Sequence, residues 1–286
     1  MEFLSPRTLD DALAARAEHP DAVPIMGGTD VMVELNFDRR RPSHLLDLTR
    51  IEELTAWDRV DDHIRLGAGV TYARVIDELA TELPGLALAS RTVGSPQIRN
   101  RGTVGGNLGA ASPAGDAHPS LLAASAEVEL SSVSGVRRVP AADFYQGVKR
   151  HAGRPDELVT AVWIRPAGGP QQFSKVGTRN AMVIAVAAFA MALHPEEERV
   201  GTGIGSAAPT PRRAEDAERF LSAELDWAGR ADVSDLVSAE FARLVAGASA
   251  PIDDVRGTAA YRTHALSVMA RRCLAWTWVA YQEGRT

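Results

Sequence analysis

Cysteine is nearly missing from this chain of 286 residues. The single cysteine, Cys273, excludes a disulfide within the chain. An iron–sulfur cluster needs about four cysteine ligands, so the chain cannot build one alone. The seven histidines are scattered, and none stands at metal-ligand spacing from another or from the cysteine. The sequence therefore predicts no metal site.

Excess positive charge and long apolar runs are also missing. The 31 basic residues face 37 acidic ones, for a net charge of −6, which argues against a nucleic-acid partner. No apolar run reaches the roughly 20 residues of a membrane span. The polar start at Met1 lacks a secretory pattern. We therefore expect a cytoplasmic globular protein with room for two domains.

Glycine, in contrast, is concentrated between Ile98 and Asp116, where it occupies positions 102, 105, 106, 109 and 115. This density predicts a loop rather than a helix or a strand. Backbone N–H groups that converge in such a loop suit a phosphate. Polar side chains that could assist them stand in the same stretch: Arg99, Arg101, Thr103, Asn107 and Asp116. A glycine-rich surface loop without a ligand is the alternative.

A second glycine turn lies nearer the N-terminus, in Pro24-Ile-Met-Gly-Gly-Thr-Asp-Val31. Like the first, it follows an apolar segment. Two such turns would suit a pyrophosphate that is held from two sides.

The two turns carry a resemblance to a known family. Gly27-Gly28-Thr29-Asp30 and Thr103-Val-Gly-Gly-Asn107 resemble the paired FAD-binding signature of the FAD subunits of molybdenum hydroxylases. This family includes the FAD subunits of bacterial xanthine dehydrogenase and the medium subunit of carbon monoxide dehydrogenase. Five further segments follow in the family's order, so that the resemblance covers nearly the whole chain: 112–116, 140–147, 175–181, 208–212 and 252–257.

The resemblance implies an α+β fold. Residues 1–168 would form an FAD-binding domain of the p-cresol methylhydroxylase and vanillyl-alcohol oxidase type, with two α/β subdomains. Residues 169–286 would form a smaller α+β C-terminal domain. The linker at Gly168-Gly-Pro170 marks the boundary.

The resemblance also implies the site. No histidine or cysteine matches a flavin-linking position, so FAD would be bound non-covalently, and no catalytic residue can be assigned. The family often has an aromatic residue at position 93, where this chain has valine. The cofactor-binding positions carried over are Pro24, Ile25, Met26, Gly27, Gly28, Thr29, Asp30, Val31, Val93, Thr103, Val104, Gly105, Gly106, Asn107, Asp116, Val159 and Lys175.

The implied activity is that of an FAD-dependent oxidoreductase subunit. Electrons would arrive from two [2Fe–2S] clusters on an iron–sulfur small subunit and leave for NAD⁺ or another acceptor. A large molybdopterin subunit would carry the molybdenum cofactor, in a heterotrimer that is doubled to a heterohexamer. The segment Lys175–Met182 is most similar to the purine-oxidising branch, which favours xanthine as the substrate of the complex. The alternatives are a stand-alone FAD-dependent reductase of the same fold superfamily and a non-enzymatic nucleotide-binding scaffold.

Several local patterns give further expectations. Alternating apolar residues predict a strand over 63–70, and Thr71 then opens a helix. Gly67-Ala-Gly69 at this junction is not a dinucleotide fingerprint, because Tyr72 holds the third glycine position. His118 is expected to be structural.

The second half of the chain gives three more expectations. Gly201-Thr-Gly-Ile-Gly205 predicts a turn associated with a strand, and Pro211 predicts the first residue of a helix. A long helix is expected over 259–281. Its buried stripe would comprise Leu266, Met269, Cys273, Trp276 and Ala280.

Overall fold

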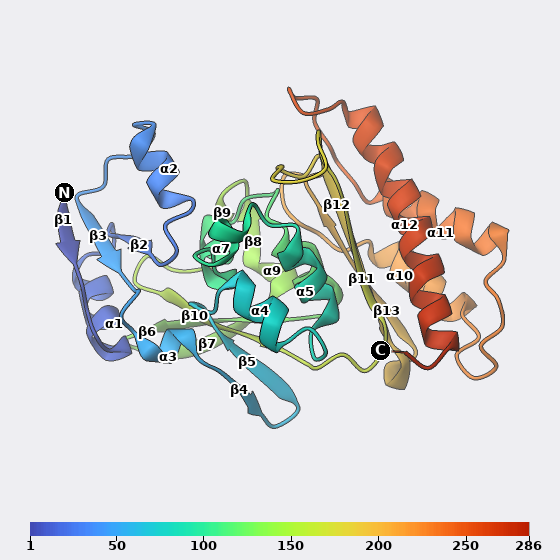
Figure 1. Cartoon of the computed structure of the whole chain (residues 1–286), viewed down its shortest axis with the longest axis horizontal. Coiled ribbons are helices and arrows are strands. Elements are labelled where there is room, and N and C mark those ends of the chain that lie inside the picture. Colours follow the sequence, from blue (N-terminus) through green and yellow to red (C-terminus); the bar gives the residue numbers. More distant parts are fainter. Residues whose placement is uncertain (286) are drawn as a thin grey trace.

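A computed structural model describes residues 1–285 (Figure 1). The N-terminal elements are β1 (Glu2–Leu4), α1 (Leu9–Glu18), β2 (Val23–Ile25), α2 (Val31–Asn36) and β3 (His44–Asp47). The three strands form a parallel sheet in the order β1-β3-β2. Thr8 begins α1 as expected, because its side chain accepts a hydrogen bond from the Asp11 N–H. Since parallel strands end at the same edge, the segments after β2 and β3 meet there.

The central part is an antiparallel sheet in the order β4-β5-β10-β6-β7, with helices packed against it. Its strands are β4 (Trp57–Val60), β5 (His63–Gly67), β6 (Glu127–Ser132), β7 (Gly135–Pro140) and β10 (Leu158–Ile164). A small hairpin pairs β8 (Tyr145–Gly147) with β9 (Arg150–His151). The helices are α3 (Glu52–Thr55), α4 (Tyr72–Glu78), α5 (Pro84–Arg91), α6 (Pro96–Arg99), α7 (Val104–Ala110), α8 (Ala117–Ala123) and α9 (Ala141–Phe144).

The loop expected over 98–116 is wrong in part, because α7 occupies its centre. Gly105 lies inside this helix, and a Cβ there would lie 2.5 Å from the Ala68 carbonyl oxygen. Glycine is therefore required for the close approach of α7 to the end of β5. The Thr103 side chain caps the helix by accepting a hydrogen bond of 2.9 Å from the Gly106 N–H.

The C-terminal part is built on a third, antiparallel sheet in the order β11-β12-β13. Its elements are β11 (Gln171–Val176), β12 (Ala187–His194), η1 (Pro195–Glu197), β13 (Arg199–Gly205), α10 (Glu215–Glu224), α11 (Asp235–Gly247) and α12 (Ala259–Gln282). Helices α10–α12 cover one face of the sheet (Figure 1). Helices α5 and α8 pack on its other face.

The strand-associated turn expected at 201–205 is wrong in its turn, because these residues form most of β13 itself. A Cβ on Gly201 would collide with the Ala123 carbonyl oxygen, and one on Gly203 with the Pro119 carbonyl oxygen. Alternate glycines on one face of the strand thus allow α8 to lie directly on the sheet.

Two expectations for the C-terminal helices also need correction. Helix α10 begins at Glu215, because Arg212 pairs with Ile204 of β13 in an isolated bridge that keeps the preceding segment extended. On α12, Trp276 is 49% exposed. The buried stripe instead continues through Thr277 and Trp278.

Candidate functional site: a polar cradle beside two glycine segments

The two glycine segments are in direct contact. A Cβ on Gly27 would collide with the Arg101 carbonyl oxygen and would lie 3.1 Å from the Gly102 Cα. Gly28 has a φ of +75°, a conformation that favours glycine, and it turns the chain into α2. The structure therefore brings together the two segments that the sequence singled out.

The paired glycines of α7 differ in their surroundings. Gly105 is buried against Ala68, so a side chain there would disturb the fold before it met any ligand. Gly106 is exposed, and a Cβ there would meet only the Thr103 hydroxyl, at 3.0 Å. Both have the negative φ of a helix. Of the two, only Gly106 lies at the surface, where the absence of a side chain leaves room for a ligand beside α7.

A buried ion pair lies close by. The Lys175 Nζ, from β11, donates to Asp116 Oδ2 at 2.6 Å, and the two side chains are 7% and 9% exposed. Lys175 also donates to the Thr92 carbonyl oxygen at 3.0 Å. Burial raises the pKa of Asp116, and the neighbouring ammonium offsets this in part. The pair thus joins the C-terminal sheet to the segment that follows α7.

Four buried polar atoms of this region have no hydrogen-bond partner within residues 1–285: Tyr72 Oη, Asn107 Oδ1, Asp116 Oδ1 and His118 Nε2. Buried polar groups are nearly always hydrogen-bonded. Asn107 and His118 both flank Gly115, where an added Cβ would lie 2.8 Å from Asn107 Nδ2 and 2.6 Å from His118 Cδ2. Several unpaired groups on neighbouring segments indicate a site for a polar ligand. We call the surface formed by these four residues and Lys175 the cradle.

His118 and Tyr145 form a neutral pair behind the cradle. Their side chains are hydrogen-bonded, with 2.8 Å between the Tyr145 hydroxyl oxygen and His118 Nδ1. Burial lowers the pKa of His118 to about 3. Burial also raises the pKa of the Tyr145 phenol. The imidazole is therefore uncharged at neutral pH.

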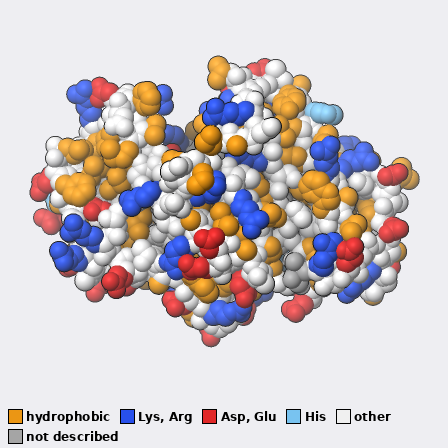
Figure 2. All heavy atoms as spheres, in the orientation of Figure 1, with side chains coloured by type: hydrophobic (Ala, Val, Ile, Leu, Met, Phe, Trp, Pro, Cys, Tyr) orange, Lys and Arg blue, Asp and Glu red, His pale blue; other side chains and the backbone are white. Residues whose placement is uncertain are grey.

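A second ion pair joins α2 to the β8–β9 turn. The Lys149 Nζ, in the β8–β9 turn, donates to the Glu34 carboxylate of α2 at 2.7 Å. Burial raises the pKa of Asp30, which precedes α2, and Lys149 opposes the shift. In Figure 2 the surface is hollowed between the lobe that carries α2 and the centre of the molecule.

Comparison with known proteins adds the family. Residues 1–166 match the model of the FAD binding domain in molybdopterin dehydrogenase. Residues 172–277 match the CO dehydrogenase flavoprotein C-terminal domain. The chain belongs to this flavoprotein family. The resemblance and the α+β fold inferred from the sequence are confirmed.

Individual relatives align along nearly the whole chain. The nicotine 6-hydroxylase medium subunit of Paenarthrobacter nicotinovorans is 30% identical, over 96% of each chain. The xanthine dehydrogenase FAD-binding subunit of Escherichia coli O157:H7 is 29% identical, over 94% of this chain and 92% of that one. A solved structure of reconstituted CO dehydrogenase from Oligotropha carboxidovorans superposes with a TM-score of 0.89, at 29% identity and 98% coverage of both chains.

Some residues predicted for the site of this flavoprotein lie outside the cradle. Val104 is fully buried in the central core, so its side chain serves packing. Val93 and Val159 are half-buried against the same core. The Val93 carbonyl oxygen accepts a hydrogen bond of 3.0 Å from Arg99. No hydrogen bond within the described chain links either valine to the Asp116–Lys175 pair.

Sequence reasoning missed other residues of the flavoprotein's cradle. Tyr72 was noted only because it interrupts a glycine pattern, and His118 was expected to be structural. Thr92 and Tyr145 contact the cradle through Lys175 and His118. Neither was predicted for the site, because they reach it only through the packing of α5 and the β8–β9 hairpin.

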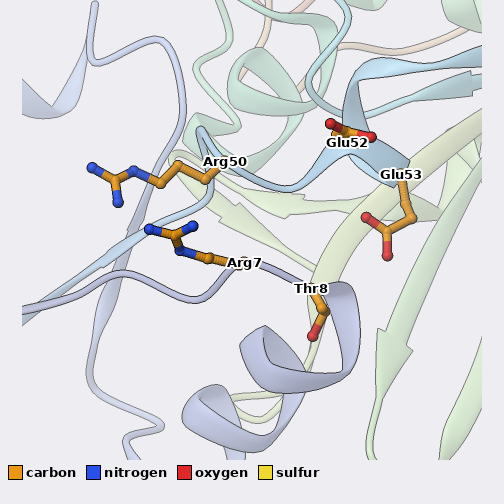
Figure 3. Close-up of a pocket in the computed structure, with 5 residues that line it drawn as sticks. All are labelled: Arg7, Thr8, Arg50, Glu52 and Glu53. Atoms are coloured by element: carbon orange, nitrogen blue, oxygen red, sulfur yellow. The ribbon is translucent and has the colours of Figure 1, made fainter.

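A second, open hollow of about 750 Å³ lies at the carboxyl edge of the N-terminal sheet. Its lining residues are Arg7, Thr8, Arg50, Glu52 and Glu53 (Figure 3). Exposed charges of both signs balance there, so it gives no indication of a specific ligand. Over residues 1–285, no group of three or more histidine, cysteine or acidic side chains could hold a metal ion. In the same residues, no helix is both long and apolar enough to cross a bilayer.

Proposed function

We propose that the cradle binds FAD non-covalently and that this chain is the electron-transfer subunit of a molybdenum hydroxylase complex. The observation that carries the proposal is the set of four unpartnered polar atoms beside the two glycine segments. The family match to an FAD-binding domain supports it independently.

The residues present fit the chemistry of FAD. Backbone N–H groups of Gly27–Asp30 would hold the pyrophosphate. The exposed Gly106, which has no side chain, would let the cofactor approach the start of α7 closely. The free oxygens of Asn107 and Asp116 would accept hydrogen bonds from hydroxyl groups of the cofactor. Val93, Val159 and the apolar residues of 24–31 would supply walls, as the resemblance implies.

The protein's own contribution is position and electrostatics. FAD, when bound, supplies the redox chemistry that no side chain of this protein offers. The Asp116–Lys175 pair is buried as a unit, so it can orient polar groups without adding net charge to the site. Lys175 keeps the C-terminal sheet against the cradle, which helps to exclude water.

We propose that the partners are an iron–sulfur small subunit with two [2Fe–2S] clusters and a molybdopterin large subunit, in a heterotrimer that dimerises to a heterohexamer. The single cysteine supports this, because the clusters must reside on another chain. Relatives that carry the name "medium subunit" also support it.

We further propose xanthine or a related purine as substrate and NAD⁺ as acceptor, with the complex in the cytoplasm. The support is the likeness of Lys175–Met182 to the purine-oxidising branch. Relatives are named for nicotine, nicotinate and carbon monoxide, so the substrate must be identified by experiment. Turnover of the intact complex over a panel of purines, aldehydes, N-heterocycles and carbon monoxide, with several acceptors, is the test. Cell fractionation tests the location.

The division into domains at 168/169 is likewise a proposal. Strand β10 ends at Ile164, and β11 begins at Gln171 in a different sheet. Limited proteolysis at Gly168–Pro170 would test it.

The cofactor assignment is tested on the purified chain. We expect a flavin absorbance spectrum and release of the yellow colour into the supernatant on acid precipitation. Colour in the pellet would contradict non-covalent binding, and a colourless chain that cannot be reconstituted with FAD would favour the scaffold. Copurification with cysteine-rich partners would separate a complex subunit from a stand-alone reductase.

A further inference from the structure

Tyr72 lies where the two glycine segments meet. It begins α4 directly after the cap Thr71, and its N–H donates to the Gly102 carbonyl oxygen at 3.0 Å. A Cβ on Gly102 would lie 3.4 Å from the Tyr72 ring and 3.5 Å from the Thr29 hydroxyl. The ring thus packs in the central core with one edge toward Gly102, beside the segments that would hold the pyrophosphate in the proposed function.

The Tyr72 hydroxyl is buried and unpaired. The residue is 3% exposed, and its oxygen has no hydrogen-bond partner within residues 1–285. Burial raises the pKa of this phenol well above its ordinary value, and the nearby Asp116 and Asp30 raise it further. It therefore stays a protonated hydrogen-bond donor.

A purely structural role does not explain this hydroxyl. A buried hydroxyl without a partner destabilises the fold, whereas a phenylalanine of nearly the same volume would avoid that cost. The other three unpaired atoms of the cradle lie in the same region. Two of them, Asn107 Oδ1 and Asp116 Oδ1, are hydrogen-bond acceptors. Tyr72 is the one hydroxyl among the four.

We propose that the Tyr72 hydroxyl contacts the cofactor directly and donates a hydrogen bond to a phosphate or sugar oxygen of FAD. The inference rests on the proposed function and adds a binding residue that neither the motifs nor the family match indicates.

The test is Tyr72→Phe in the full chain. The apo variant should unfold at the same temperature as the wild type or slightly higher, because only an unpaired hydroxyl is lost. Its FAD dissociation constant should rise about threefold to tenfold, and by more if the acceptor is a charged phosphate. Calorimetric titration with FAD and with ADP gives the affinities. A loss with both ligands places the contact on the ADP half, and a loss with FAD alone places it on the flavin half; both support the proposal.

Tyr281→Phe is the matched control. The Tyr281 hydroxyl donates to the Trp227 carbonyl oxygen at 3.0 Å in the C-terminal core. This variant should lose apo stability and keep its FAD affinity, the opposite pattern. Unchanged FAD affinity in Tyr72→Phe overturns the inference and leaves the proposed function standing. Reduced affinity together with reduced apo stability would assign Tyr72 to the fold and also overturn it. A wild-type chain that binds no FAD overturns both proposals.

Discussion

His118 shows how burial fixes the charge of a single residue. Its pKa lies near 3 in the folded chain and near 6.5 when the chain unfolds. Between these values the unfolded state binds one more proton than the folded state, so falling pH destabilises the fold. This contribution is fully present above about pH 6.5 and is lost progressively down to about pH 3.

We therefore predict that His118→Gln makes stability less dependent on pH. From about pH 7 to about pH 5, the wild type should lose about 2 kcal/mol more unfolding free energy than the variant. Urea denaturation at the two pH values measures this difference. Equal losses in both proteins would mean that His118 is already protonated, or solvated, in the folded chain.

The Asp116–Lys175 pair leads to a second prediction at the residue scale. Lys175→Met leaves a buried carboxylate without its cation, which should cost about 3–5 kcal/mol of unfolding free energy. The double variant with Asp116→Asn should recover a large part of this loss, because no buried charge remains. Denaturant unfolding of the single and double variants measures the coupling. Purely additive losses would show that the two groups do not act as a pair.

The glycines of α7 and β13 show what the sequence could predict at the scale of elements. The sequence predicted β5, the β6–β7 hairpin and the length of α12. In each of these elements, the spacing of apolar residues shows which side chains are buried. The places of the glycines were not predicted, because their reason is the backbone of a distant segment. Gly105 must be glycine because the Ala68 backbone lies against it, and Gly203 must be glycine because the Pro119 backbone lies against it. From the neighbouring residues alone, such glycines could only be predicted to lie in loops and turns.

The same limit applied to the site. The two glycine segments were found from their glycine content, and Asp116 and Lys175 were found from the family pattern. The structure brings the two glycine segments into contact and pairs Asp116 with Lys175. Tyr72 was missed, because nothing in its neighbouring residues distinguishes a core tyrosine from one at a ligand.

At α7, we predict that Gly106→Ala lowers the affinity for FAD, whereas Gly105→Ala lowers the stability of the fold. Gly106→Ala should keep the apo fold and weaken FAD binding about tenfold to a hundredfold, because a side chain there would keep the cofactor away from the exposed start of α7. Gly105→Ala should destabilise the apo chain, because its Cβ would lie 2.5 Å from the Ala68 carbonyl oxygen. Circular dichroism and flavin content of each variant separate the two effects. Gly106→Ala with full FAD affinity would remove this helix from the binding site.

At β13, Gly203→Ala should cost about 1–3 kcal/mol or more, because its Cβ meets the backbone of α8. Gly109→Ala is the matched control, since a Cβ there has no atom within 4 Å. It should stabilise α7 by about 0.5–1 kcal/mol. Thermal unfolding compares them. A neutral Gly203→Ala would show that α8 can move away from the sheet at little cost.

At the scale of the whole molecule, the C-terminal sheet is shared between both parts of the chain. On β12, small residues such as Ala188 and Ala190 face α5 and α8, whereas Phe189 and Met191 face the core under α10–α12. The N–H of Gly85 in α5 also donates to the buried Gln171 side chain at 3.0 Å. The two parts are therefore packed together rather than joined only by a linker, which keeps Lys175 at the cradle.

The single cysteine limits what the whole chain can do alone. It can hold a flavin but has only one cysteine, so it cannot build the iron–sulfur path by which electrons would arrive from a substrate. The purified, FAD-loaded chain should therefore show at most NADH–dye reductase activity and should oxidise no purine or aldehyde. Adding the two partner subunits should restore substrate oxidation. The measurement is dye reduction with NADH, xanthine and an aldehyde, with and without the partners. Substrate oxidation by the partner-free, metal-free chain would refute its role as one subunit of a longer electron path.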